Sequence, residues 1–248
     1  MQCKYIKRTI TAGNFVEIEK TESYVYGEKI ARGIKNKPTP EDVKKINEIN
    51  AARKLKWLIN SNFGYNDIHA TLTYRPSERR PPPEAQKLLS KFLEKAKAIY
   101  LADGLEFKYI SVTEYKRKAI HHHLVIPGID IRKLTDIWPY GKIRPTYLDN
   151  TGNYELLADY LIKETSKTFK EIDGASRKRW NASKNLTKPV IKTEIVKAKS
   201  WKAEPKPLKG YFVLQDSIYN GVCEITGRRF QRYSMLKLWP TGLKINGS

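Results

Sequence analysis

Three of the four histidines in the chain stand next to one another, inside the stretch FKYISVTEYKRKAIHHHLVI at residues 107–126. Imidazoles in such a cluster can bind a metal ion, so the stretch around them decides which ones converge. Two runs of strand-forming residues, 107–113 and 119–126, flank the polar segment 114–118. This pattern predicts two antiparallel strands joined by a tight turn.

Alternation along the second strand divides the three histidines between two faces. His121 and His123 are expected on one face and His122 on the other. Two imidazoles about 7 Å apart on one face can bind the same ion. Glu114, at the end of the partner strand, could add a carboxylate oxygen. The three side chains therefore predict a metal site of two nitrogens and one carboxylate, with room left for a substrate.

A possible nucleophile follows in the stretch YELLADYLIKETSK at residues 154–167, which has apolar residues at helical spacing and no Gly or Pro. This stretch predicts a helix, and Tyr160 and Lys163 share one of its faces. A phenol with a pKa of about 10 is a weak nucleophile, and a nearby lysine charge favours its ionised form. Taken singly, each motif has an ordinary alternative: solvated histidines on a strand, and a tyrosine packed at a helix boundary.

The order of these groups resembles the HUH endonuclease superfamily. Within it, the chain is most similar to single-tyrosine rolling-circle replication initiators of phages, plasmids and small single-stranded DNA viruses. HATLTY at 69–74 resembles the first family motif, His121 and His123 resemble the metal pair, and Tyr160 resembles the nucleophile. In the family the residue between the two metal-binding histidines is usually bulky and apolar, and here it is His122.

Two further stretches, WPYGKI at 138–143 and WNASKNLTKP at 180–189, resemble initiators of the filamentous-phage type. The resemblance covers about residues 45–190. It implies an antiparallel sheet that carries the metal on one face, with the tyrosine helix lying across that face. It favours Mg²⁺ or Mn²⁺ as the cofactor.

The resemblance also implies the reaction and the partner. Tyr160 would attack single-stranded origin DNA at a hairpin or nick site, which leaves a 5′-phosphotyrosine link and a free 3′ hydroxyl. The DNA contacts that it assigns to the first motif are Thr71, Thr73 and Tyr74. His69 and His122 could each contact DNA or serve the packing, and the sequence leaves both roles open. It also leaves open the replicon type, the origin sequence and the oligomeric state.

The charge of the chain favours a nucleic-acid partner. Lys and Arg number 47 against 26 Asp and Glu, a formal net charge of +21. Such an excess fits a phosphate backbone, and no apolar run approaches the roughly 20 residues of a membrane span. No signal peptide is visible, and the two cysteines have no metal-ligand spacing, which predicts a cytoplasmic location, in the host cell if the protein is of viral or plasmid origin.

A basic run at 176–188 offers a second candidate contact with DNA. Arg177, Lys178 and Arg179 precede Trp180, and such a mixture suits a single strand because charges follow phosphates while a ring stacks on a base. The alternative is a solvated loop with Trp180 packed into the core. The chain has no GxxxxGK[ST] phosphate-binding loop, so a separate host helicase is expected to open the duplex.

From residue 67 onward the expected order is β-α-β-β-α-β-α, which predicts an α+β fold with helices packed against one face of an antiparallel central sheet. We expect three segments. Residues 1–44 form a strand-rich extension and linker, 45–170 the endonuclease domain, and 171–248 a basic extension packed on the core.

Other protein classes fit parts of this pattern. Fe(II) oxygenases also use two histidines and one carboxylate, but their usual His-x-Asp/Glu spacing is absent. Conjugative relaxases generally have a third histidine and an N-terminal tyrosine, a layout that this chain lacks. A single-tyrosine transposase would use the same chemistry. A non-enzymatic single-stranded DNA-binding protein would need only the charge.

Overall fold

The computed structural model describes residues 4–23, 39–116, 119–166, 178–198, 200–223 and 227–238. The chain divides into two compact units: residues 42–188, and residues 1–41 together with 189–248. The three-segment division expected from the sequence treated the two ends of the chain as separate extensions. Strand pairing instead joins them in one sheet. That residues 45–170 form an endonuclease domain stays a prediction.

The unit of residues 42–188 is built on a five-stranded antiparallel sheet in the order β6-β3-β5-β4-β7. Its elements are α1 (Pro40–Asn62), β3 (Ile68–Leu72), the short 3-10 helix η1 (Pro76–Glu78), α2 (Pro82–Ala102), β4 (Ile110–Lys116), β5 (Ala119–Ile126), α3 (Ile131–Thr135), β6 (Ile143–Tyr147), α4 (Glu155–Ser166) and β7 (Asn181–Ala182). The predicted order of strands and α-helices from residue 67 onward is confirmed, and so is the α+β class.

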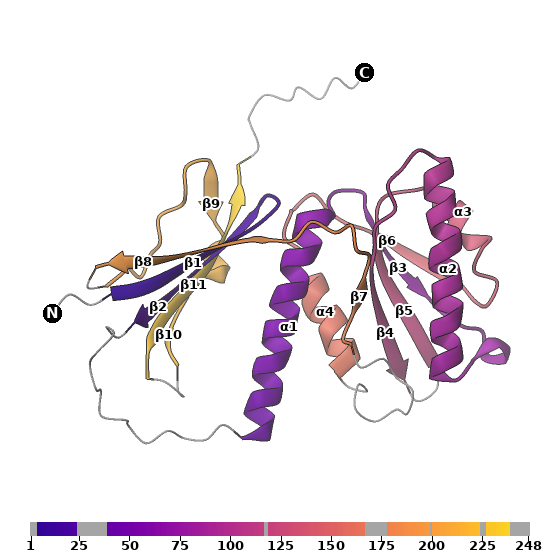
Figure 1. Cartoon of the computed structure of the whole chain (residues 1–248), viewed down its shortest axis with the longest axis horizontal. Coiled ribbons are helices and arrows are strands. Elements are labelled where there is room, and N and C mark those ends of the chain that lie inside the picture. Colours follow the sequence, from indigo (N-terminus) through magenta and orange to yellow (C-terminus); the bar gives the residue numbers. More distant parts are fainter. Residues whose placement is uncertain are drawn as a thin grey trace. The chain divides into compact units, whose positions relative to one another are not determined.

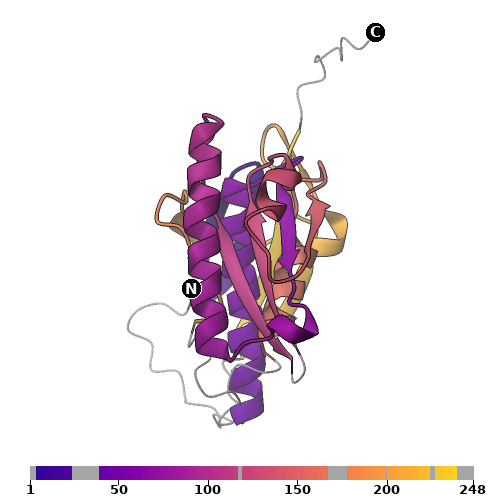
Figure 2. The same cartoon turned by 90° about the vertical axis from the view of Figure 1, so that its right-hand side faces the viewer.

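Helices cover both faces of this sheet, so the expectation of helices on one face is wrong (Figure 1). On one face, Val112 and Val125 pack with Leu161 of α4 and with α1. On the other, Ala70 and Leu124 pack with α2, which lies in front of the sheet in Figure 2. The strands carry apolar side chains at both alternating positions, and each set requires its own cover. We call the two faces the α4 face and the α2 face.

The hairpin of β4 and β5 has a shorter turn than the sequence suggested. β4 begins at Ile110 and continues to Lys116, whereas the sequence placed its end at Thr113. Glu114 therefore lies within the strand ladder, directly opposite His121. Because directly opposite residues of an antiparallel pair share a face, the two side chains lie together on the α4 face.

The second unit is a six-stranded antiparallel sheet in the order β10-β11-β2-β1-β8, with β9 also paired to β11. Its elements are β1 (Lys4–Ala12), β2 (Phe15–Ser23), β8 (Val190–Lys197), β9 (Tyr211–Val213), the 3-10 helix η2 (Gln215–Ser217), β10 (Tyr219–Val222) and β11 (Arg229–Lys237). The predicted strands at 15–20, 210–214 and 232–238 correspond to β2, β9 and β11. A small core of Val16, Ile18, Tyr233 and Met235 holds the sheet to the segment around β9.

The expected strand at residues 23–27 falls almost entirely outside the described residues. Among the helices of the described part of the chain, none has the length and apolar character needed to cross a membrane.

Candidate active site

Two histidines and one carboxylate meet on the α4 face, as the alternation of β5 predicts. Nδ1 of His121 lies 3.4 Å from Oε2 of Glu114, and Nε2 of His123 lies 3.5 Å from the same oxygen. Glu114 and His123 are each 2 % exposed. The His121 side chain is 27 % exposed and forms the solvent edge of the group. The three side chains thus offer two nitrogens and a carboxylate at one half-open position.

The spacing of these donor atoms suits a shared cation. Two ligands bound at about 2.1 Å to one ion are about 3.0–3.5 Å apart, and both imidazole nitrogens lie at such distances from the Glu114 oxygen. A carboxylate buried between two imidazoles is also a donor set that divalent ions accept. As it stands, however, no group of three His, Cys, Asp or Glu side chains within the described ranges has the arrangement that would hold a metal ion. The donor types fit, so the side chains would adjust when an ion binds.

His69 and Thr71 extend this group along β3. Nε2 of His69 lies 3.2 Å from Nδ1 of His123, and the Thr71 hydroxyl lies 3.3 Å from the same nitrogen. Burial, and then the neighbouring His123, lower the pKa of His69 to about 4. His69 is therefore neutral at pH 7, and one of the two facing nitrogens can donate a hydrogen bond to the other.

The sequence left the role of His69 open, although a signal for its position was present. His69 precedes Thr71 by two residues, so both lie on one face of β3. Thr71 stands directly opposite His123 in the neighbouring strand. Pairing β3 with the histidine strand would have placed His69 beside the predicted metal pair. The pairing itself is a long-range contact that the periodicity of either strand does not reveal.

Tyr160 of α4 lies against the same histidines. Its ring centre is 5.5 Å from that of His123 and 6.1 Å from that of His69, both in edge-to-face geometry. Tyr160 is 42 % exposed, so its ring contacts the histidines while the residue stays open to solvent. Ala158, Leu161 and Ile162 anchor α4 to the sheet. A position one residue before Leu161 and two before Ile162 therefore falls at the flank of the helix rather than beneath it.

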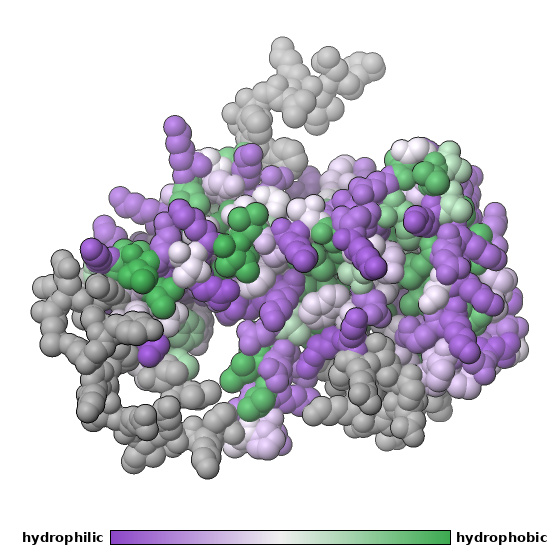
Figure 3. Space-filling model, viewed as in Figure 1, coloured by the Kyte–Doolittle hydropathy of each residue, from purple (hydrophilic) through white to green (hydrophobic). Residues whose placement is uncertain are grey.

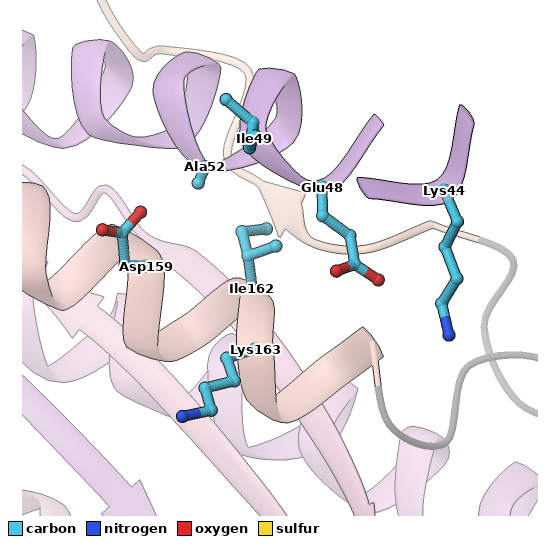
Figure 4. A pocket seen from close by; sticks show the side chains of 7 residues that line it. All are labelled: Lys44, Glu48, Ile49, Ala52, Asp159, Ile162 and Lys163. Atoms are coloured by element: carbon cyan, nitrogen blue, oxygen red, sulfur yellow. The ribbon is translucent and has the colours of Figure 1, made fainter. Parts of the chain in front are cut away.

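Lys163 lies one helical turn after Tyr160 and is exposed. It stands at the rim of a cavity of about 370 Å³ between α1 and α4. In Figure 4, Asp159 and Ile162 point from α4 toward α1, whereas the Lys163 side chain extends from the other side of α4, away from α1. The amine is thus directed to solvent on a helix turn adjacent to Tyr160. Its action on the tyrosine or on a phosphate stays a prediction.

His122 points to the α2 face, which confirms the predicted alternation, and it is fully buried. Its Nε2 lies 2.9 Å from the Tyr74 hydroxyl and its Nδ1 lies 2.9 Å from the Thr113 hydroxyl. Burial, and then the neighbouring histidines, lower its pKa to about 3. His122 is a neutral packing residue, and both of its ring nitrogens are used inside the fold.

The three residues of the first motif that were assigned to DNA have different environments. Thr71 faces the histidine group. The Thr73 hydroxyl accepts a hydrogen bond from the backbone N–H of Lys142 at 3.2 Å. Tyr74 is 7 % exposed on the α2 face, and burial raises the pKa of its phenol. The position of Tyr74 does not favour a contact with DNA.

The stretch WPYGKI at 138–143 closes over the end of β3. Nε1 of the buried Trp138 donates to the Thr73 carbonyl at 3.0 Å. A Cβ atom added to Gly141 would overlap the same oxygen, so only glycine allows this approach. The stretch holds in place the strand that carries His69 and Thr71.

The basic run at 176–188 is attached to the sheet by β7, which pairs with β4. Arg177 lies outside the described residues. Lys178, Arg179 and Trp180 line a cavity of about 390 Å³ together with Asn47, Asn50, Ala51 and Lys54 of α1. Trp180 also packs against the core cluster of the α4 face. The structure thus combines the two alternatives for Trp180, a ring that is half in the core and half at a basic, amide-lined surface.

Comparison with known proteins matches residues 67–169 to the family described as replication-associated protein ORF2. No curated protein and no solved structure matches the chain. The matched residues begin just before β3 and end just after α4, so they include the histidine group, Glu114 and Tyr160. This match supports a role for the chain in DNA replication, as a protein of the replication-associated type.

Proposed function

We propose that the chain is a rolling-circle replication initiator that nicks and rejoins single-stranded origin DNA through Tyr160. The observation that carries this proposal is the edge contact of the Tyr160 ring with His123, whose Nε2 faces the Glu114 carboxylate. The family match of residues 67–169 supports the replication context. The formal charge of +21 supports a polyanionic substrate.

In the proposed reaction the Tyr160 oxygen forms a bond to phosphorus while the bond from phosphorus to the 3′ oxygen breaks. The proton that the phenol loses is balanced by the one that the 3′ oxygen gains. The products are a 5′-phosphotyrosine link and a free 3′ hydroxyl, and the reverse attack rejoins the strand without ATP. Solvent exposure of Tyr160 leaves room for the phosphodiester.

Glu114, His121 and His123 would hold a divalent ion, Mg²⁺ or Mn²⁺. When bound, such an ion supplies polarisation of the scissile phosphate. His69 and Thr71 orient the His123 ring through its Nδ1. Lys163 contributes a positive charge one helix turn from the nucleophile, where it favours the ionised phenol.

The test is formation of a denaturant-stable adduct between the full chain and labelled single-stranded origin DNA in the presence of Mn²⁺. Tyr160→Phe is expected to abolish the adduct, since it removes the nucleophilic oxygen and keeps the ring. Tyr65→Phe is the matched control, because Tyr65 is an exposed tyrosine of the same unit. EDTA should also abolish the adduct.

An adduct that maps to another residue, or that survives in Tyr160→Phe, contradicts the assignment of the nucleophile. DNA binding that is identical in both variants without any adduct would leave a non-enzymatic binding protein. A single-tyrosine transposase would give the same adduct, and only the identity of the DNA site that is cut separates it from an initiator.

A further inference from the structure

Strand β8 is the outer strand of the six-stranded sheet, and within the described residues it pairs with β1 alone. Its other edge presents a row of backbone N–H and C=O groups that can pair with a further strand. Edge strands in stable monomers are usually short, bulged or covered. β8 is eight residues long and pairs with β1 without interruption from Val190 to Lys197.

The side chains of β8 are also unusually apolar for an exposed edge. Val190 is 68 % exposed, Ile191 47 % and Ile195 70 %. Figure 3 shows apolar side chains gathered along the path that β8 takes in Figure 1. Exposed apolar side chains on a long edge strand are typical of a strand that pairs with another chain.

The sequence of β8, VIKTEIVK, is complementary to itself in one antiparallel register. With Thr193 opposite Thr193 of a second copy, Lys192 stands opposite Glu194, Ile191 opposite Ile195, and Val190 opposite Val196. By two-fold symmetry each of these pairs occurs twice. Directly opposite residues of an antiparallel pair are in side-chain contact, so this register gives two opposite-charge pairs flanked by four apolar pairs.

Neighbouring registers lack this match. A shift by two residues places Lys192 opposite Lys192, or Glu194 opposite Glu194, and like charges directly opposite are destabilising. A register with the symmetry axis between Lys192 and Thr193 places Glu194 opposite Ile191. Only the register centred on Thr193 matches charge with charge and apolar with apolar.

We propose that β8 is a self-association surface through which two copies of the chain form a two-fold symmetric dimer with one continuous antiparallel sheet. The occupant of the edge is thus a second copy, because the strand complements its own sequence in charge and in apolar character. A two-fold interface uses the same patch on both copies, and a self-complementary strand meets that requirement. Glu194 already contacts Lys192 at 3.1 Å and Lys7 at 3.4 Å, so the carboxylate is positioned on the β8 surface before association.

The test uses two charge reversals in the full chain, Lys192→Glu and Glu194→Lys, and measures self-association by sedimentation over a range of protein concentrations. In Lys192→Glu the introduced carboxylate stands opposite the native Glu194 carboxylate of a second copy. In Glu194→Lys the introduced amine stands opposite the native Lys192 amine. Each like-charge pair occurs twice, so each variant alone should dimerise at least about tenfold more weakly than the unmodified chain.

An equimolar mixture of the two variants restores both opposite-charge pairs and should dimerise as well as the unmodified chain. Lys209→Glu and Glu204→Lys are the matched controls. They change the net charge equally at exposed positions of the same unit, away from β8, and should leave dimerisation unchanged. Because these positions are exposed, circular dichroism should show the same folded state for all variants.

An unmodified chain that stays monomeric up to about 100 µM overturns the proposal, since an edge of this length and composition should associate by then. Unaltered dimerisation of both single variants overturns it as well, as does a mixture that associates no better than either variant alone. Restoration in the mixture alone identifies β8 as the contact, because no surface elsewhere in the chain would be corrected by that combination.

Discussion

Burial holds two of the four histidines in a neutral form, and these two lie on opposite faces of the same sheet. His122 is locked between Tyr74 and Thr113, whereas His69 faces His123. A residue that contacts a metal-binding histidine through its distal nitrogen fixes the tautomer and the orientation of that ring. His69 is therefore a positioning residue for the candidate metal site, and His122 supports the strand from the other side.

His69→Ala should weaken the binding of Mn²⁺ by about 10–100-fold, the usual effect of removing such a supporting group. The measurement is a calorimetric titration of Mn²⁺ into the full chain at pH 7. Thr146→Ala is the control, since Thr146 stands opposite His69 in the neighbouring strand β6 and is exposed. An unchanged affinity in His69→Ala would separate His69 from the metal site.

The lowered pKa of His122 makes the fold sensitive to acid. As pH falls below about 6.5, the unfolded chain binds a proton that the folded chain refuses until about pH 3, so stability decreases across that interval by up to about 1.4 kcal/mol per pH unit. His122→Gln removes this proton. Between pH 6.5 and 4.5 in EDTA, urea unfolding should show a loss smaller by about 2 kcal/mol in the variant than in the unmodified chain. Equal losses would place the proton elsewhere.

At the scale of elements, local patterns were sufficient for some features and not for others. The helix expected to begin at Pro40 does begin there, and the predicted helix around Tyr160 is α4. The turn after Thr113 was misplaced because Glu114–Lys118 is polar throughout, and polarity does not distinguish a turn from the solvent end of a strand. The pairings of β3 with β5 and of β1 with β8 connect distant residues, and no local pattern encodes such pairings.

The turn formed by 138–142 provides a test at this scale. Gly141→Ala would force a methyl group onto the Thr73 carbonyl, and the backbone that must move is the end of β3. We expect a loss of about 1–3 kcal/mol in the free energy of unfolding, measured in urea, together with weaker adduct formation. Gly64→Ala is the matched control because its Cβ would meet open space, and it should change stability by at most about 0.5 kcal/mol. Equal stability of both variants would show that the turn yields.

At the scale of the whole molecule, the first and last parts of the chain form one sheet, and the middle part carries the candidate active site. Hydrophobic periodicity could not have shown this, because strands near both ends of the chain pair across the sequence that lies between them. The proposed dimer adds a consequence for function. One tyrosine per chain performs one strand transfer at a time, and two copies joined through β8 carry two Tyr160 side chains in one particle.

The net charge of +21 leads to a prediction about salt. Each phosphate that a lysine or arginine neutralises releases counterions, so the affinity for single-stranded DNA should fall with a slope of about −0.7 per contact in a plot of log affinity against log salt. With about six contacts, a rise from 50 to 200 mM NaCl lowers the affinity by a factor of about 100 or more. Fluorescence anisotropy with an oligothymidine measures this slope. Lys54→Ala and Lys178→Ala, at the cavity beside Trp180, should each reduce it by about one contact, whereas Lys209→Ala in the other unit should not. A slope that is equal in all four proteins would move the DNA path away from α1.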